Sequence, residues 1–222
     1  MTRRSLVITT AAIAAILFAV GAYVYQRSYA DQQARLAASE SNHLVRPHSP
    51  VIGPTDAPVT IVEFFDPSCE SCRAFHPFVK QIMAKHPKDV RLVLRYAPFH
   101  QGSDEAVGIL ETARLQNLFL PVLEALLATQ PNWAVHGAPN LRIAWQAARS
   151  AGLDIERAQR DAKRPEIQEM LKQDVADIRA VNVTQTPTFF VNGKPLTSFG
   201  QRQLDELVRA EVEAVKERAA AR

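Results

Sequence analysis

The only two cysteines of the 222-residue chain, Cys69 and Cys72, are separated by two residues. A disulfide between them would close a very small loop, which restrains the unfolded chain little, so a purely stabilising role is disfavoured. At the start of a helix such a pair suits thiol:disulfide exchange, because the helix N-terminus stabilises a thiolate. We predict that Cys69 is the attacking thiol and that Cys72, one turn further on, is the shielded resolving thiol.

The residues around the pair predict a strand, a turn and a helix in succession. Segment 58–65, PVTIVEFF, is rich in β-branched and aromatic residues, as a buried strand is. After the cysteines, apolar residues recur at helical spacing: Phe75, Phe78, Val79, Ile82 and Met83. A second strand over 89–99 follows at a distance typical of a βαβ unit. Cys69 is therefore expected at the helix start.

The rest of the chain predicts helices and then a hairpin. Residues 103–181 carry apolar stripes at helical spacing, which we interpret as core-facing helix. Segment 184–199 contains Asn-Gly between two strand-like runs, the signature of a β-hairpin. A last helix is expected from about Gln201.

An acidic residue, Glu63, interrupts the apolar strand six residues before Cys69. An ionised carboxylate is costly to bury, so the pKa of Glu63 is expected to be raised. Such an acid could accept the proton of Cys72. The alternative is that Glu63 points to solvent at the edge of the strand.

The N-terminus predicts export of the domain. Residues 5–25 carry no charge over 21 positions, enough for one transmembrane helix. Arg3 and Arg4 before it should stay in the cytoplasm. We interpret residues 1–30 as a signal anchor in the inner membrane, with the catalytic domain in the periplasm or on the outer face. Cleavage after the small-x-small site at 28–30 is the alternative.

Between anchor and domain, residues 31–57 are polar and proline-punctuated and are interpreted as a short stem. The domain is expected over 58–222. Outside the three arginines of the first 30 residues, the chain carries 23 basic and 23 acidic residues. It has no basic stripe or aromatic platform, so no nucleic-acid partner is predicted.

These motifs together resemble one protein family. VIGPTDAPVTIVEFFDPSCESC (51–72), Pro77 in the first helix and TQTPTFFVNGK (184–194) are similar to the DsbA-like branch of the thioredoxin superfamily, exported bacterial thiol:disulfide oxidoreductases. The resemblance covers about residues 50–218. It implies an α/β thioredoxin fold with a helical insertion at about 103–181, preceded here by the predicted transmembrane helix.

The resemblance also implies roles for particular residues. Thr186 and Pro187 match the loop that packs beside the cysteines and receives substrate backbone, and Pro187 is expected to be cis. Glu63 matches the buried acid of the family, and Pro77 matches its helix-kinking proline. No cofactor is implied, because the dithiol itself carries the electrons.

One departure concerns the dipeptide between the cysteines, Glu70-Ser71, where the strongly oxidising members of the family carry a histidine. A carboxylate beside Cys69 should raise the pKa of that thiol and stabilise the disulfide. We therefore expect a centre that is less oxidising than the strongest members of the family.

The motifs fit either direction of electron flow, and oxidation of other proteins is favoured. An oxidase would pass its disulfide to cysteine-containing exported proteins and be reoxidised by a membrane, quinone-linked partner. A reductase or isomerase would be kept reduced by a membrane electron donor. Isomerases of the superfamily oligomerise through an N-terminal extension, for which the stem is too short, so a monomer is expected.

Metal binding is the competing class of function. Cys69, Cys72 and His76 form C-x₂-C-x₃-H, which could hold Cu(I) as in a copper chaperone. A closed zinc site would need a fourth ligand, and the chain has no second cysteine pair. His76 is more simply a packing histidine on the helix, so no metal is predicted. His100, after the second strand, could lie near the site or only in a loop.

Overall fold

The computed structural model describes residues 27 and 43–221. The predicted transmembrane helix at 5–25 lies outside the described residues. Among those that are described, no helix is both long and apolar enough to cross a membrane.

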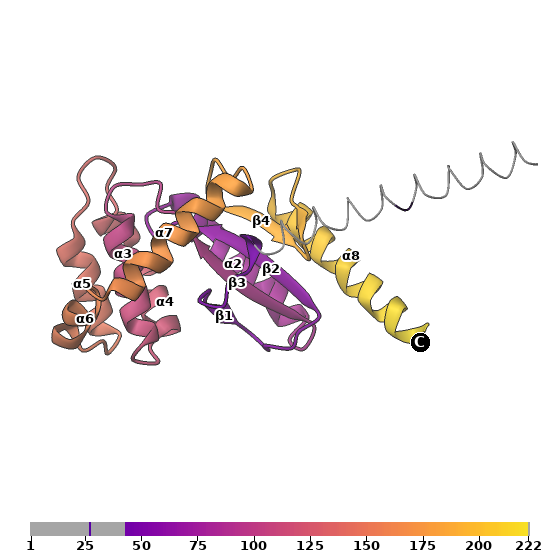
Figure 1. Cartoon of the computed structure of the whole chain (residues 1–222), viewed down its shortest axis with the longest axis horizontal. Coiled ribbons are helices and arrows are strands. Elements are labelled where there is room, and N and C mark those ends of the chain that lie inside the picture. Colours follow the sequence, from indigo (N-terminus) through magenta and orange to yellow (C-terminus); the bar gives the residue numbers. More distant parts are fainter. Residues whose placement is uncertain (1–26, 28–42, 222) are drawn as a thin grey trace, which may run out of the picture. The chain divides into compact units, whose positions relative to one another are not determined.

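The described chain starts and ends with mixed strands and helices, and a run of five helices separates the two parts (Figure 1). In chain order they are β1 (Val51–Ile52), β2 (Val59–Phe65), α2 (Glu70–Lys85), β3 (Val90–Tyr96), α3 (Ser103–Arg114), α4 (Phe119–Trp133), α5 (Leu141–Ser150), α6 (Ile155–Asp161), α7 (Pro165–Ala180), β4 (Thr188–Val191), β5 (Lys194–Pro195) and α8 (Gln201–Ala220).

The strands form one mixed sheet in the order β1-β3-β2-β4-β5. β2 and β3 are parallel and joined through α2, as the βαβ spacing predicted. β4 pairs antiparallel with β2, so that Glu63 lies opposite Phe189. The central strand β2 therefore receives neighbours on both edges and carries buried residues on both faces.

Alternation along β2 sends its residues to two different layers. Ile61, Glu63 and Phe65 share the face on which α2 and α8 pack, and Ile61 and Phe65 belong to the large core there. Val62 and Phe64 face the other way, into a smaller core with Ile178 of α7. Glu63 thus points to the layer that contains the cysteines.

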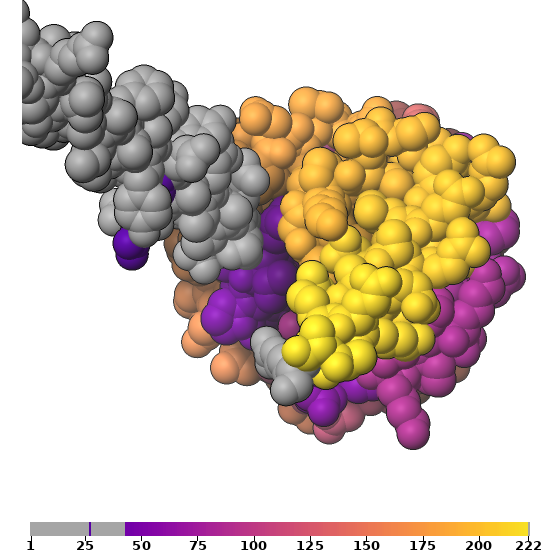
Figure 2. Space-filling model, turned by 90° about the vertical axis from the view of Figure 1, so that its right-hand side faces the viewer, coloured from indigo at the N-terminus to yellow at the C-terminus, as the bar shows by residue number. Residues whose placement is uncertain are grey.

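The hairpin and the last helix follow the sequence pattern closely. Asn192 and Gly193 both have positive φ, 48° and 82°, which the Asn-Gly pair of a tight hairpin adopts at little cost. α8 begins at Gln201, as expected, and contacts α2, β2 and β4. Figure 2 shows its surface beside that of the hairpin.

Residues 43–57 belong to the folded body, which differs from the stem expected over 31–57. β1 pairs antiparallel with β3, and the Leu44 side chain is buried in the smaller core. The polar, proline-containing sequence hides this because its contacts are with distant residues. The sequence-based boundary at residue 58 therefore falls inside the domain.

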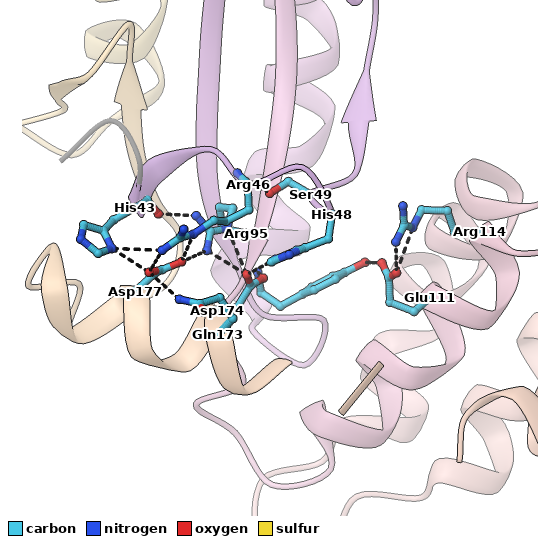
Figure 3. Close-up of polar contacts among 11 residues, drawn as sticks. His43, Arg46, His48, Ser49, Arg95, Glu111, Arg114, Gln173, Asp174 and Asp177 are labelled. Atoms are coloured by element: carbon cyan, nitrogen blue, oxygen red, sulfur yellow. Dashed lines mark hydrogen bonds and ion pairs between the residues drawn. The ribbon is translucent and has the colours of Figure 1, made fainter. Parts of the chain in front are cut away.

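A buried ion cluster fixes this segment to the sheet and to α7 (Figure 3). At its centre the fully buried Arg95 of β3 donates to Asp174 at 2.8 Å and to Asp177 at 2.7 Å. Its guanidinium also lies 5.7 Å from the ring centroid of Phe64. We call Arg95, Asp174 and Asp177 the Arg95 cluster.

Three side chains of the N-terminal segment complete the cluster's hydrogen bonding. Arg46 donates to both carboxylate oxygens of Asp177, at 2.6 and 2.7 Å. His43 Nδ1 lies 2.7 Å from Asp177, and His48 Nε2 lies 2.7 Å from Asp174. The two histidines, for which the sequence offers no partners, therefore pair with carboxylates more than 120 residues away.

Candidate functional site

Both cysteines lie at the start of α2, just after the turn that follows β2. Cys69 is the N-cap residue of α2, and Cys72 lies in its first turn. The Cys69 side chain is 6% exposed and Cys72 is fully buried. Both thiols are free, so the geometry is that of the dithiol state. Only Cys69 is therefore open to a disulfide in another protein.

The environment of Cys69 favours its thiolate. A hydrogen bond with Cys72 is the largest effect, and it lowers the pKa of Cys69 to about 5 against the opposing effect of burial. The Thr186 side chain and the backbone N–H groups of Ser71 and Cys72 lower it further. The last two donors are the unpaired amides of the helix start.

Cys72 behaves in the opposite way. Burial, above all, raises the pKa of Cys72 well above its ordinary value, and the hydrogen bond with Cys69 and the charges of Glu63 and Cys69 raise it further. The backbone N–H of Asp66 donates to its sulfur at 3.5 Å, a weak opposing effect. A proton shared by the two sulfurs therefore stays on Cys72, which supports Cys69 as nucleophile and Cys72 as resolving thiol.

Alkylation of the reduced protein should separate the two thiols. We expect the rate of Cys69 alkylation by iodoacetamide to rise with pH through a midpoint at about 5, because the thiolate is the reactive form. Cys72 should stay unmodified at neutral pH in the folded protein. Quenched time points read by peptide mass spectrometry give both rates, and a Cys69 midpoint near the ordinary thiol value of about 8.5 would contradict the assignment.

Glu63 is buried, and the alternative of a solvent-facing carboxylate is wrong. Its side chain is 1% exposed, and its Oε1 atom has no hydrogen-bond partner. Burial, and then the negative charge of Cys69, raise the pKa of Glu63 to about 8. At neutral pH the group is therefore mostly protonated, and it can exchange a proton close to its own pKa.

The loop before β4 lies against the attacking sulfur. The peptide bond between Thr186 and Pro187 is cis, and Pro187 is buried. Cys69 Sγ lies 3.2 Å from the carbonyl oxygen of Thr186. The two segments are 117 residues apart in sequence and are brought together by the pairing of β4 with β2.

The raised pKa that was expected for Cys69 because of Glu70 is not found. The pKa of Cys69 is lowered, and the groups that dominate it are Cys72, Thr186 and the helix amides. Glu70 is exposed to water, which screens its charge. It lines a surface cavity together with the positively charged Arg73. Ser71 is exposed as well and contributes through its backbone N–H.

Asp66 is a site residue that the sequence analysis missed. Its fully buried carboxylate accepts hydrogen bonds from the N–H groups of Ser68, Phe99 and His100 at 2.8, 2.8 and 3.0 Å. The Ser103 hydroxyl donates to it at 2.5 Å, and His100 Nδ1 lies 2.7 Å away. It joins the active-site turn to the loop before α3. The turn dipeptide Asp-Pro was the only local signal.

His76 does not join the cysteines in a metal site. Its Nε2 lies 3.0 Å from Oε1 of Glu124 in α4, an oxygen that also accepts a hydrogen bond from Lys80. Within residues 27 and 43–221, no group of three or more His, Cys, Asp or Glu side chains could hold a metal ion. The copper alternative built on Cys69, Cys72 and His76 therefore lacks its geometry.

A buried Cys-x-x-Cys pair at a helix start, beside a cis-proline loop on a mixed sheet, defines the class of thioredoxin-fold dithiol proteins. A family model described as thioredoxin matches residues 46–210. The chain belongs to the thioredoxin family. The α/β fold with a helical segment inserted between β3 and β4 is thereby confirmed.

Solved structures narrow the comparison. A thioredoxin-like oxidoreductase from Silicibacter pomeroyi is 30% identical, with a TM-score of 0.65, over 78% of this chain and 94% of that one. BdbD from Bacillus subtilis is 25% identical, with a TM-score of 0.65, over 74% and 93%. Wolbachia pipientis α-DsbA1, 15% identical over 82% and 99%, shares the fold with a TM-score of 0.72. The prediction of a DsbA-like thiol:disulfide oxidoreductase is confirmed.

Curated relatives match over a shorter part of their length. The Na⁺/H⁺ antiporter NhaA of Herminiimonas arsenicoxydans is 31% identical over 159 residues, which is 71% of this chain and 25% of the antiporter. The chain spans about a quarter of the length of the curated relatives it matches.

Proposed function

We propose that the chain is an oxidant that transfers a Cys69–Cys72 disulfide to cysteines of exported proteins. The observation that carries this direction is the stabilised thiolate of Cys69. Because that thiolate exists only in the reduced protein, its low pKa favours the dithiol over the disulfide at neutral pH. A disulfide whose reduced form is stabilised is a strong oxidant.

The steps balance in atoms and electrons. A client thiolate attacks Cys69 Sγ, which forms a mixed disulfide and releases Cys72 as a thiolate. A second client thiolate attacks the client sulfur of that bond, forms the client disulfide and releases Cys69 as a stable thiolate. The client loses two electrons and the Cys69–Cys72 bond gains them.

Glu63 is proposed as the proton donor to Cys72 in this direction, and as the acceptor in reverse. A thiolate at the buried Cys72 position is costly, and for this reason the pKa of Cys72 is raised. Glu63 lies in the same buried layer, and its charge is one of the effects that raise the pKa of Cys72. Its own pKa of about 8 means that it holds a proton at neutral pH. Thr186 and Pro187 would receive the client backbone, since their loop lies against Cys69.

The setting of this chemistry is part of the proposal. We place the domain in the periplasm or on the outer face of the inner membrane, held by the apolar segment 5–25 as a monomer. A quinone-linked membrane partner would restore the disulfide after each transfer.

The test is the reduction potential of the Cys69/Cys72 couple in the full chain, measured by equilibration with glutathione and trapping of free thiols. Because the pKa of Cys69 is lowered and not raised, we replace the weaker oxidant expected from Glu70 by a value toward the oxidising end of the family, about −120 mV. A value near the thioredoxin figure of about −270 mV would overturn the oxidant direction and indicate a reductase or isomerase. Failure to exchange with glutathione at all would overturn the proposed function itself.

A further inference from the structure

A glutamine of the helical insertion makes direct contact with the active-site backbone. Gln130 of α4 donates from Nε2 to the carbonyl oxygen of Pro67 at 2.8 Å and to that of Cys69 at 3.0 Å. Its Oε1 accepts from Arg73 Nε at 2.9 Å. The side chain is only 1% exposed, so water does not compete for these bonds.

These partners determine the orientation of the Gln130 amide. Pro67 and Cys69 offer carbonyl oxygens, which only accept, and Arg73 offers an N–H, which only donates. A flipped amide would place Oε1 against two carbonyl oxygens and its NH₂ group against a guanidinium. The observed orientation uses both amide hydrogens and the oxygen, so the side chain is fixed in one position.

The two carbonyls belong to the turn that presents the attacking sulfur. The Cys69 carbonyl also accepts the N–H of Arg73, the first backbone bond of α2, at 3.1 Å. An amide donor on the Pro67 and Cys69 carbonyls offsets the negative ends of two dipoles that lie in the same turn as the sulfur. It also holds the Cys69 backbone so that the amides of Ser71 and Cys72 stay directed at Sγ.

We propose that Gln130 is a positioning residue of the exchange reaction, which acts through the Pro67 and Cys69 carbonyls to keep Cys69 a thiolate and the disulfide oxidising. The effect of Gln130 on disulfide exchange rests on the proposed function. It connects the insertion to the redox centre, because the donor comes from α4 and the acceptors from the turn between β2 and α2.

The test replaces Gln130→Glu in the full chain. The carboxylate has nearly the shape of the amide but offers two acceptors to two carbonyl oxygens and adds a negative charge. We expect the equilibrium constant with glutathione to shift about 10-fold toward the protein disulfide, with the alkylation midpoint of Cys69 about one pH unit higher. Gln130→Met, which removes the bonds without adding charge, should shift both in the same direction but less.

The matched control is Gln168→Glu, the same change at an exposed position of α7. It should leave the equilibrium constant and the alkylation midpoint as in the unchanged protein. A role that is only structural would lower the melting temperature without moving either reading. Folded Gln130→Glu and Gln130→Met proteins with unchanged values of both would overturn the proposal.

The two readings distinguish this inference from the proposed function. Alkylation of Cys69 needs no disulfide exchange, so its midpoint reports the role of Gln130 even in a protein that does not exchange with glutathione. If Gln130→Glu fails to fold, Gln130→Met decides, because methionine is neutral and similar in length.

Discussion

Replacing Arg95→Met should lower the free energy of unfolding by about 3–5 kcal/mol, the usual cost of removing one partner from a buried ion pair. Asp174 and Asp177 are as buried as Arg95 itself. Without the guanidinium they remain as two buried carboxylates, and Arg46 is the cation that still pairs with Asp177.

Urea unfolding of the full chain, followed by circular dichroism, measures this loss. The matched control is Arg202→Met, whose ion pair with Glu206 is exposed and which should change stability by less than about 0.5 kcal/mol. A loss below about 1 kcal/mol for Arg95→Met would mean that the cluster does not depend on this cation.

The stability of the protein at low pH should also depend on the Arg95 cluster. Burial alone would raise the pKa of Asp177, but hydrogen bonds from Arg46, His43 and Arg95 hold it well below its ordinary value. Such a group adds stability above its unfolded pKa of about 4, and the contribution is lost as pH falls toward the folded value. The unchanged protein should therefore lose stability below about pH 4, and Arg95→Met should lose less over that range.

Replacing Cys69→Ala should reduce exchange with protein disulfides to the uncatalysed background, while Cys72→Ala should trap the reaction halfway. The first variant keeps a thiol that is fully buried and protonated, which cannot attack. The second loses the hydrogen bond from Cys72 but keeps Cys69, whose thiolate the helix amides still stabilise, and it lacks the thiol that resolves the mixed disulfide.

Mass spectrometry after incubation with glutathione disulfide separates the two outcomes. Cys72→Ala should carry one glutathione at Cys69 and keep it, and Cys69→Ala should carry none while folded. Ser71→Ala, at the exposed position between them, should cycle as the unchanged protein does. An adduct on Cys72 in the Cys69→Ala protein would reverse the roles of the two thiols.

Local patterns were sufficient for the parts of the site that lie within one supersecondary unit. The Cys-x-x-Cys spacing, the helix after it and the buried acid Glu63 all come from residues 58–85, where periodicity 2 changes to helical periodicity. The Asn-Gly hairpin is equally local. The cis-proline loop was predicted only through the resemblance, since no spacing rule brings Thr186 to Cys69.

What escaped prediction depends on contacts between distant segments. Gln130 lies 61 residues from Cys69, and a single glutamine on an apolar helix has no signature of its own. Asp66 looks like an ordinary turn residue until the loop at 99–103 closes over it. The lowered pKa of Cys69 was not predicted, because Glu70 is adjacent in sequence and was expected to raise it. Glu70 is exposed, and water screens its charge.

The Arg95 cluster also has a mechanical consequence. The described body begins at His43, and within a few residues the chain is fastened by Arg46 and His48 to α7 and by β1 to β3. A pull on the chain before His43 would load these attachments first: the contacts with α7 and the pairing of β1 at the edge of the sheet. The turn that carries Cys69 and Cys72 takes no part in these attachments, so such a pull would not act on it directly.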